Sequence, residues 1–155
     1  MQFQIRLILF LIIGNFLLSD SIKYNNPNNH GVVGLINIPT ARFYEESSSA
    51  FTMYRGDPDR KITLTMMPFD WFEASVFYTS IKDRPYISGQ DYKDKGFNAK
   101  FRLKSEGRFP AIAIGFNDLA GTGIYSSEYI VGSYGIGNLD MHLGAGWGRL
   151  DGGQF

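Results

Sequence analysis

The sequence predicts an all-β fold, an antiparallel meander of about eight strands joined by short turns. Three observations lead to this prediction. Apolar and polar side chains alternate with a period of two along most of the chain after residue 30. Gly, Pro, Asp and Asn stand where the alternating runs stop, as they do in tight turns. The 18 Gly residues and an aromatic content of 15% favour sheets over helices.

The first residues predict an export signal. Arg6 precedes an apolar run at residues 7–18, which is shorter than the roughly 20 residues that a membrane-spanning helix needs. We therefore expect a signal peptide at residues 1–20, followed by a flexible, Asn-rich lead-in at residues 21–30. The alternative interpretation of the apolar run is a buried N-terminal helix.

After the lead-in, each strand is predicted from its alternation and from the turn residues that end it. A longer polar loop at residues 81–94 interrupts the series. The strand candidates are residues 31–37, 49–55, 61–67, 71–80, 96–104, 110–117, the stretch 118–133 after its opening turn, and 139–148.

Two of these segments define the expected faces of the sheet. In residues 96–104, apolar side chains from Phe97 to Leu103 alternate strictly with polar ones from Asn98 to Lys104. In the stretch 118–133, Tyr125, Tyr129 and Val131 share one face, and Ser126, Glu128 and Gly132 share the other. We expect an apolar, aromatic face opposite a small, polar one.

Two closed architectures fit a meander with such faces: a membrane β-barrel and a soluble sandwich or barrel. The strand lengths match the roughly 9–11 residues that cross a bilayer. Charges and glycines on the polar face would suit a wet interior, and aromatic residues stand at strand ends, as in interfacial girdles. The aromatic residues concerned are Trp71, Tyr78, Tyr125 and Trp147. The soluble alternative would instead bury the apolar face in a core.

Composition excludes several functions. Fifteen basic and 15 acidic residues leave a net charge of zero, which argues against a nucleic-acid partner. The sequence contains no Cys and two His, so thiolate chemistry and a His-rich metal centre are not expected. Several pairs of Gly residues are separated by one residue, but they lack the spacing of phosphate-binding loops. We expect no cofactor and no metal.

The candidate functional residues form a polar stripe that we expect to face the interior of the barrel. Lys100 and Arg102 could contact an anionic polysaccharide, or they could form cross-strand ion pairs with acidic residues such as Glu73, Asp118 and Glu128. The stripe comprises Glu73, Asn98, Lys100, Arg102, Glu128, Asp140 and His142.

Asp140 and His142 also suggest a catalytic alternative. They share a face, and with Ser126 or Ser133 across the sheet they could form a Ser-His-Asp set. The sequence has no nucleophile elbow, so we expect polar interior residues and no catalytic site.

Several motifs resemble the YjbH family, outer-membrane proteins linked to exopolysaccharide production in Gram-negative bacteria. The resemblance covers roughly residues 31–150. The motifs are GLINIPTAR from Gly34, MPFDWFEA from Met67, YKDKGF from Tyr92, residues 118–133, and LGAGWG from Leu143.

The resemblance implies an outer-membrane location, or the periplasm as the alternative, and a non-catalytic role in exopolysaccharide biosynthesis or export. The implied partners are outer-membrane lipid, a polysaccharide and other secretion proteins. Family members are much longer, so residues 31–155 are expected to be part of a barrel. Many members are lipoproteins, whereas this sequence has no Cys to acylate. The rival hypotheses are a soluble periplasmic domain that binds glycan and, more remotely, an envelope enzyme.

Overall fold

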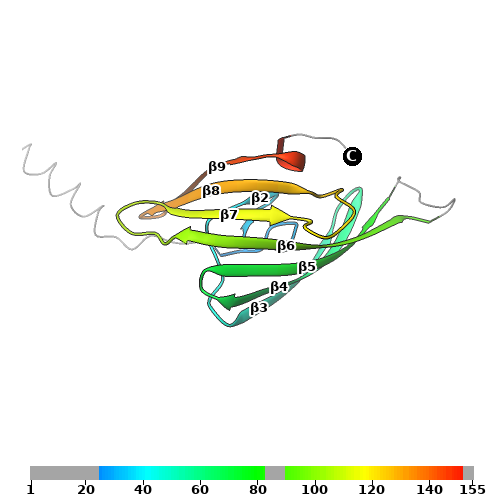
Figure 1. The fold of residues 1–155 in the computed structure, drawn as a ribbon, viewed down its shortest axis with the longest axis horizontal. Helices are drawn as coiled ribbons and strands as arrows, with labels where there is room; N and C mark the ends of the chain where they lie inside the picture. The colour runs from blue at the N-terminus through cyan, green and yellow to red at the C-terminus, as the bar shows by residue number, and fades with distance from the viewer. Residues whose placement is uncertain (1–24, 83–89, 152–155) are drawn as a thin grey trace, which may run out of the picture.

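The computed structural model describes residues 25–82 and 90–151. Within them, seven antiparallel strands form one sheet in which every strand pairs with its sequence neighbours (Figure 1). A separate two-stranded hairpin and a short 3₁₀ helix, η1 (Gly148–Asp151), complete the fold. The hairpin is β1 (Gly34–Leu35) and β2 (Ile38–Pro39), and the sheet is β3 (Ser48–Arg55), β4 (Asp59–Phe69), β5 (Phe72–Ile81), β6 (Tyr92–Lys104), β7 (Ala111–Asn117), β8 (Ser127–Ile136) and β9 (Leu139–Gly146).

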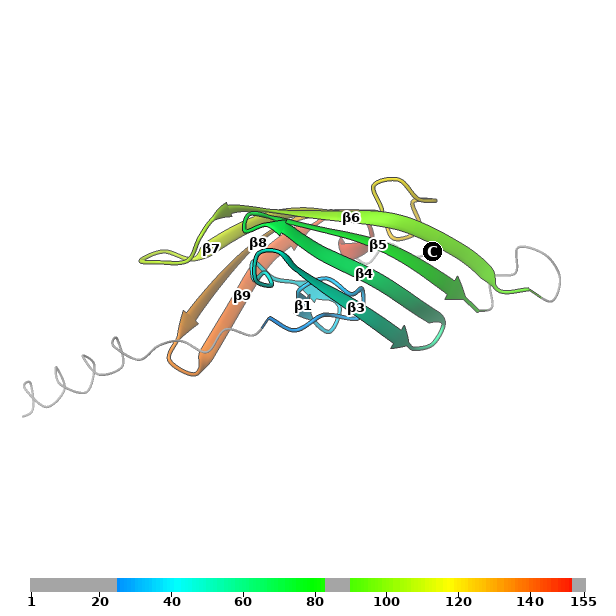
Figure 2. The same cartoon turned by 90° about the horizontal axis from the view of Figure 1, so that it is seen from below.

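The sheet curls into an arch, a half-barrel whose edges are β3 and β9 (Figure 2). Register shifts between Met66 and Phe69 and between Arg102 and Lys104 interrupt the pairing of β4 with β5 and of β6 with β7. Such irregularities bend a strand and increase its twist, which promotes curling. The predicted all-β antiparallel meander is therefore confirmed.

The two faces of the arch are chemically opposite. Along β4, the buried Lys61, Thr63 and Thr65 alternate with exposed apolar neighbours, and β5 and β6 continue the pattern. The concave face is thus polar and buried, and the convex face is apolar and exposed. Large apolar side chains exposed on the convex face include Phe51, Met53, Ile62, Leu64, Val76, Phe97, Ile130 and Leu143.

A segment N-terminal to the sheet lies beneath the arch and covers its concave face (Figure 2). We call residues 28–43 the inner segment. Gly31 lies close against the sheet: its φ is 83°, and a Cβ there would come within 2.4 Å of the Thr63 Cβ. The carbonyl of Gly31 also accepts a hydrogen bond from Thr65 Oγ1 at 2.8 Å.

The prediction of a first sheet strand at residues 31–37 is wrong. Val32 and Val33 are buried against the sheet, but this region pairs with itself in the β1–β2 hairpin. Its short apolar run reflects contact with the arch rather than membership in it. Of the lead-in expected at residues 21–30, residues 25–30 are described, and Asn28 in them is buried.

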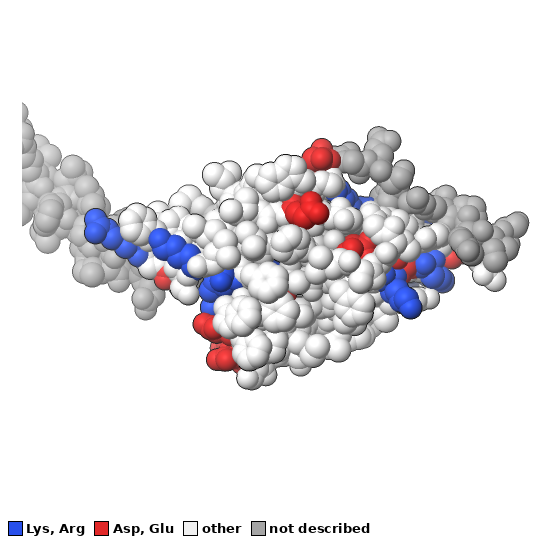
Figure 3. Space-filling model, viewed as in Figure 1, with Lys and Arg blue, Asp and Glu red and all other residues white. Residues whose placement is uncertain are grey.

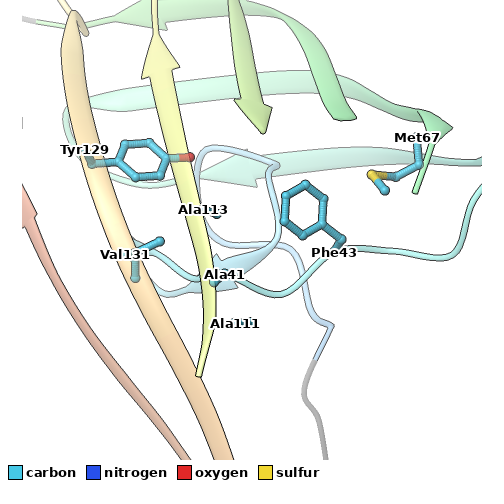
Figure 4. Packing of buried hydrophobic residues seen from close by; sticks show 7 residues of the cluster. All are labelled: Ala41, Phe43, Met67, Ala111, Ala113, Tyr129 and Val131. Atoms are coloured by element: carbon cyan, nitrogen blue, oxygen red, sulfur yellow. The ribbon is translucent and has the colours of Figure 1, made fainter. Parts of the chain in front are cut away.

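The largest apolar core joins the inner segment to the inside of the arch (Figure 4). Ala41 and Phe43 pack with Met67 of β4 and with small and aromatic side chains of β7 and β8. The β7 and β8 members are Ala111, Ala113, Tyr129 and Val131.

The expected faces of the stretch 118–133 need a correction. Tyr125, Tyr129 and Val131 do share a face, but it is the polar concave face, together with Ser127 and Ser133. The reason lies in β7, which presents small residues inward: a Cβ on Gly115 would come within 2.2 Å of the Tyr129 ring. Large rings from β8 fill this space. Tyr125, expected at an interfacial girdle, is 3% exposed.

Other aromatic residues lie on the outside. Phe69 and Trp71 stack with centroids 5.4 Å apart, and Phe72 stacks on Phe101 at 4.9 Å, at the end of the arch where β4 turns into β5. Tyr78 and Trp147 are also exposed. The predicted signal peptide at residues 1–20 lies outside the described residues. No helix in the described part of the chain is long and apolar enough to cross a membrane.

Candidate functional site

The polar concave face is the candidate functional site, and its centre is a buried ion pair. Glu73 of β5 and Lys100 of β6 are direct cross-strand partners. Lys100 Nζ lies 3.2 Å from Glu73 Oε1, and both side chains are about 1–2% exposed. The predicted cross-strand ion pairing is confirmed at this position. A charge of either sign alone in such a place would be strongly unfavourable, which explains why the two occur together.

Lys100 and Glu73 also hold the inner segment. Lys100 Nζ donates to the carbonyls of Val33 at 3.2 Å and Arg42 at 2.9 Å, and Glu73 Oε1 accepts the Val33 N–H at 3.3 Å. The Phe43 ring lies 4.4 Å from the ammonium. Because the inner segment encloses Lys100, this side chain is not placed to contact a polysaccharide.

A second polar cluster binds the inner segment to β9. Arg42 Nε donates to Asp140 Oδ2 at 3.0 Å, and its guanidinium also pairs with Asp140 Oδ1 and Glu106. A guanidinium that spans two carboxylates fixes both position and direction. Arg42 was not among the sequence candidates, because a cation that follows an apolar run gives no sign of its distant partners.

Ser133 and His142 do meet, as the catalytic alternative required. Ser133 Oγ lies 2.8 Å from His142 Nδ1, and His142 Nε2 lies 3.7 Å from Asp140 Oδ2. However, Ser133 is 1% exposed and accepts the Ala41 N–H at 2.8 Å, and Asp140 is held by Arg42. The arrangement anchors the inner segment and leaves the hydroxyl covered.

The remaining stripe residues take different positions. Asn98 is buried, donates to Ser75 Oγ at 2.8 Å and accepts the Asp118 N–H. Arg102 lies near the rim of the concave face, 3.6 Å from Asp70. Glu128 corrects the prediction: it is exposed on the convex face, opposite Phe116 of β7, because its neighbours Ser127 and Tyr129 point inward.

A third cluster, not anticipated from the sequence, lies at the end of the arch where β4 begins. Lys61 Nζ is 3.0 Å from His30 Nδ1 and 3.7 Å from the centroid of the Tyr125 ring. Tyr125 donates its hydroxyl proton to Asp59 Oδ2 at 2.6 Å. Burial, followed by that hydrogen bond, raises the pKa of Tyr125, so the phenol stays protonated.

His30 in this cluster is a neutral imidazole. Burial, with the nearby charges of Lys61 and Arg149, lowers the pKa of His30 from 6.5 to about 3. It can therefore accept a hydrogen bond from the Lys61 ammonium. No group of three or more metal-ligating side chains is present within residues 25–82 and 90–151.

Two comparisons with known proteins point to the same family. The model of the YjbH family, described as "Exopolysaccharide biosynthesis protein YbjH", matches residues 26–155. The chain is similar to the "Uncharacterized lipoprotein YjbH" of Escherichia coli (strain K12), with 37% identity over 130 residues. That match covers 79% of this chain but 19% of the relative. No solved structure matches the chain.

Proposed function

Because the chain belongs to the YjbH family of exopolysaccharide biosynthesis proteins, we propose that it forms part of an outer-membrane β-barrel that serves exopolysaccharide export or assembly. In this role the convex face of the arch meets lipid and the concave face contributes a polar interior. The chain itself performs no catalysis; it supplies a surface and a scaffold. The chemistry of making the polymer belongs to other proteins.

The observation that carries the proposal is the inverted distribution of side chains. In a soluble β-domain the apolar face of the sheet would be buried, yet here it is exposed and the polar face is buried. Exposed side chains include Met53 at 77% and Leu143 at 85%. Contiguous apolar patches of more than a few hundred Å² are rare on soluble monomers. Lipid is the natural solvent for such a face.

The placement of charges supports the same orientation. On the convex face, Lys and Arg gather toward the two ends of the arch, and the surface between them is mostly uncharged apart from a few acidic side chains (Figure 3). Phe69, Trp71 and Phe101 cluster at one end, where amphipathic rings would meet a bilayer interface. Strands of 7 to 13 residues are long enough to cross most or all of a hydrocarbon core when tilted.

Export to the envelope follows from the proposed location. The relative from Escherichia coli is named a lipoprotein, which is consistent with an exported protein attached to the envelope. This sequence has no Cys that could carry a lipid. In this proposal the signal expected at residues 1–20 directs export, and the apolar arch contributes to attachment.

The polar interior acts passively in this proposal. Its central groups, Lys100, Glu73 and Arg42, are committed to the inner segment and hold it in place. The covered hydroxyl of Ser133 supports a structural role over a catalytic one. A soluble periplasmic glycan-binding domain is the alternative, and it would require another protein to cover the convex face.

Cell fractionation tests the proposal in a host that makes exopolysaccharide. The chain should sediment with outer membranes and stay there after carbonate washing, which removes peripheral proteins. Deletion of its gene should lower the yield of exopolysaccharide without loss of polymerase activity in extracts. Recovery of the chain in the soluble periplasmic fraction would contradict the proposal and favour the alternative.

A further inference from the structure

A row of basic side chains crosses one end of the convex face, next to the β3–β4 turn (Figure 3). The sheet register aligns it: Arg55 of β3 is the partner of Arg60 of β4, and Arg60 is the partner of Ser80 of β5. Ser80 is in turn the partner of Lys93 of β6, and Lys95 follows two positions later on the same face. The four cations are exposed. We call Arg55, Arg60, Lys93 and Lys95 the basic row.

The basic row brings like charges together. Arg55 and Arg60 are directly opposed across two strands, a position in which like charges destabilise a sheet. Lys93 donates to the hydroxyl of Ser80, a neutral partner. Within residues 25–82 and 90–151, none of the four cations forms an ion pair with a carboxylate. An anion bound along the row would therefore replace repulsion with attraction.

The carboxylates around the basic row leave it with a positive excess. Asp91 acts on the row through Ser80, whose hydroxyl donates to Asp91 Oδ2 at 3.1 Å. Asp57, in the β3–β4 turn, lies 4.0 Å from Lys82, so these two charges balance each other. The carboxylates of the same strands that are buried on the opposite, concave face are Asp59 and Asp94. Among the described residues, four cations thus meet one neighbouring carboxylate.

An apolar hollow of ≈ 360 Å³ lies beside the basic row on the convex face. Lys95 belongs to both, because it also lines the hollow. Tyr78 is the cross-strand partner of Lys95 and gives this boundary the amphipathic ring typical of a membrane interface. The apolar side chains that line the hollow include Ile62, Leu64, Val76 and Phe97. Sites for an anion and for an alkyl chain therefore lie side by side.

The connections between strands indicate which leaflet this end would meet. Residues 82–91 and 118–126 connect strands at the end that carries the basic row, and each is longer than any connection at the opposite end. The connections at the opposite end are residues 70–71, 105–110 and 137–138. Outer-membrane barrels have short periplasmic turns and longer extracellular loops. In the proposed barrel, the basic row thus lies at the level of the outer leaflet.

We propose that the basic row and the hollow bind lipopolysaccharide, with the phosphates of its lipid anchor at the row and an acyl chain in the hollow. Arg and Lys are the side chains that recognise phosphate oxygens. The row spans three interstrand steps, roughly 14 Å, so a lipid with two separated phosphates fits it better than a glycerophospholipid with one. This inference rests on the proposed outer-membrane role and names the lipid that the convex face selects.

Native mass spectrometry of the full chain, refolded in detergent, tests the inference with three lipids. The probes are diphosphoryl lipid A, monophosphoryl lipid A with the same acyl chains, and phosphatidylglycerol. The diphosphoryl lipid should bind at least tenfold more tightly than the other two. The double variant Arg60→Gln, Lys93→Gln should weaken its binding at least tenfold. The matched control is Lys104→Gln, Arg108→Gln, which removes one exposed Lys and one exposed Arg at the opposite end and should leave binding unchanged.

A third variant tests the hollow without a change of charge. Val76→Trp fills it and should weaken binding of the diphosphoryl lipid several-fold. All these positions are exposed, and an unchanged circular dichroism spectrum checks that each variant folds. Equal affinity for the three lipids, or wild-type binding by the folded Arg60→Gln, Lys93→Gln variant, would overturn the inference, and wild-type binding by Val76→Trp would overturn the place given to the acyl chain.

Outer-membrane fractionation separates this inference from the proposed function. The Arg60→Gln, Lys93→Gln variant keeps the apolar convex face, so it should still sediment with outer membranes. Loss of lipid selectivity alone would therefore leave the proposed function standing, whereas recovery of the unaltered chain in the soluble periplasmic fraction would contradict both.

Discussion

Lys100 Nζ and Glu73 Oε1 lie 3.2 Å apart on adjacent strands, and the inner segment closes over both. The pair joins the sheet to the inner segment. The same two groups that face each other across β5 and β6 also bind the backbone at Val33 and Arg42. Loss of either charge should therefore loosen the inner segment as well as the sheet.

Glu73→Gln should lower the free energy of unfolding by about 3–5 kcal/mol, because it leaves the Lys100 ammonium buried without its counter-charge. Lys100→Met should cost a similar amount for the converse reason. The double variant should lose clearly less than the sum of the two, which urea unfolding in micelles would measure. Additive losses would show that the ion pair does not couple these residues.

Gly31→Ala should destabilise the protein by about 2 kcal/mol or more. The residue combines a positive φ of 83° with a 2.4 Å approach of the new Cβ to Thr63, and a left-handed conformation alone costs about 1–2 kcal/mol. Gly107→Ala is the control, since a Cβ there meets nothing within 4 Å. Equal unfolding midpoints for the two variants would refute the close docking of the inner segment.

His30 should stay neutral far below the usual range for histidine. Its pKa is lowered to about 3 in the folded protein, so between pH 6.5 and 3 the unfolded chain takes up a proton that the folded one does not. This group therefore costs no stability above pH 6.5 and lowers it progressively as the pH falls from 6.5 toward 3. Ring nitrogen shifts in ¹⁵N NMR should report neutral His30 at pH 5, whereas titration near 6.5 would contradict its burial.

The chain alone should not form an open pore. Seven strands fall short of the eight of the smallest usual barrel, and β3 and β9 have no outer strand partner among the described residues. The inner segment also fills the concave side. Planar bilayer recordings of the refolded chain should show no stable conductance level. A reproducible open level would mean that copies of the chain close a barrel around a free interior.

Much of the arch could be predicted from the sequence because alternation directly reports on the two faces of a strand. The two faces of β6 were predicted correctly, and of the two interpretations of Lys100 the structure shows the ion pair with an acidic neighbour on the adjacent strand. The rule failed in β8, where inward rings occupy the space that Gly115 and Ala113 leave. The inward direction of these rings depends on the small residues of β7, so the alternation within β8 alone could not reveal it.

The inner segment and its contacts could not be predicted in the same way. Residues 31–37 are apolar enough to resemble a strand, and nothing local distinguishes a segment beneath the sheet from one within it. The bonds of Arg42 to Asp140 and of Ala41 to Ser133 join residues more than 90 positions apart. The cluster around Lys61 likewise depends on the curl of the sheet, which brings the start of β4 to the loop before β8.

The most direct test of the central claim, that the convex face meets lipid, is site-specific labelling in intact membranes. The sequence has no Cys, so Leu64→Cys and Ile130→Cys each introduce a single thiol on that face. Asp57→Cys, in the exposed β3–β4 turn, is the water-accessible control. A water-soluble maleimide should modify position 57 rapidly and positions 64 and 130 at least tenfold more slowly, until detergent solubilisation replaces the surrounding lipid. Equal rates at all three positions in intact membranes would contradict the claim.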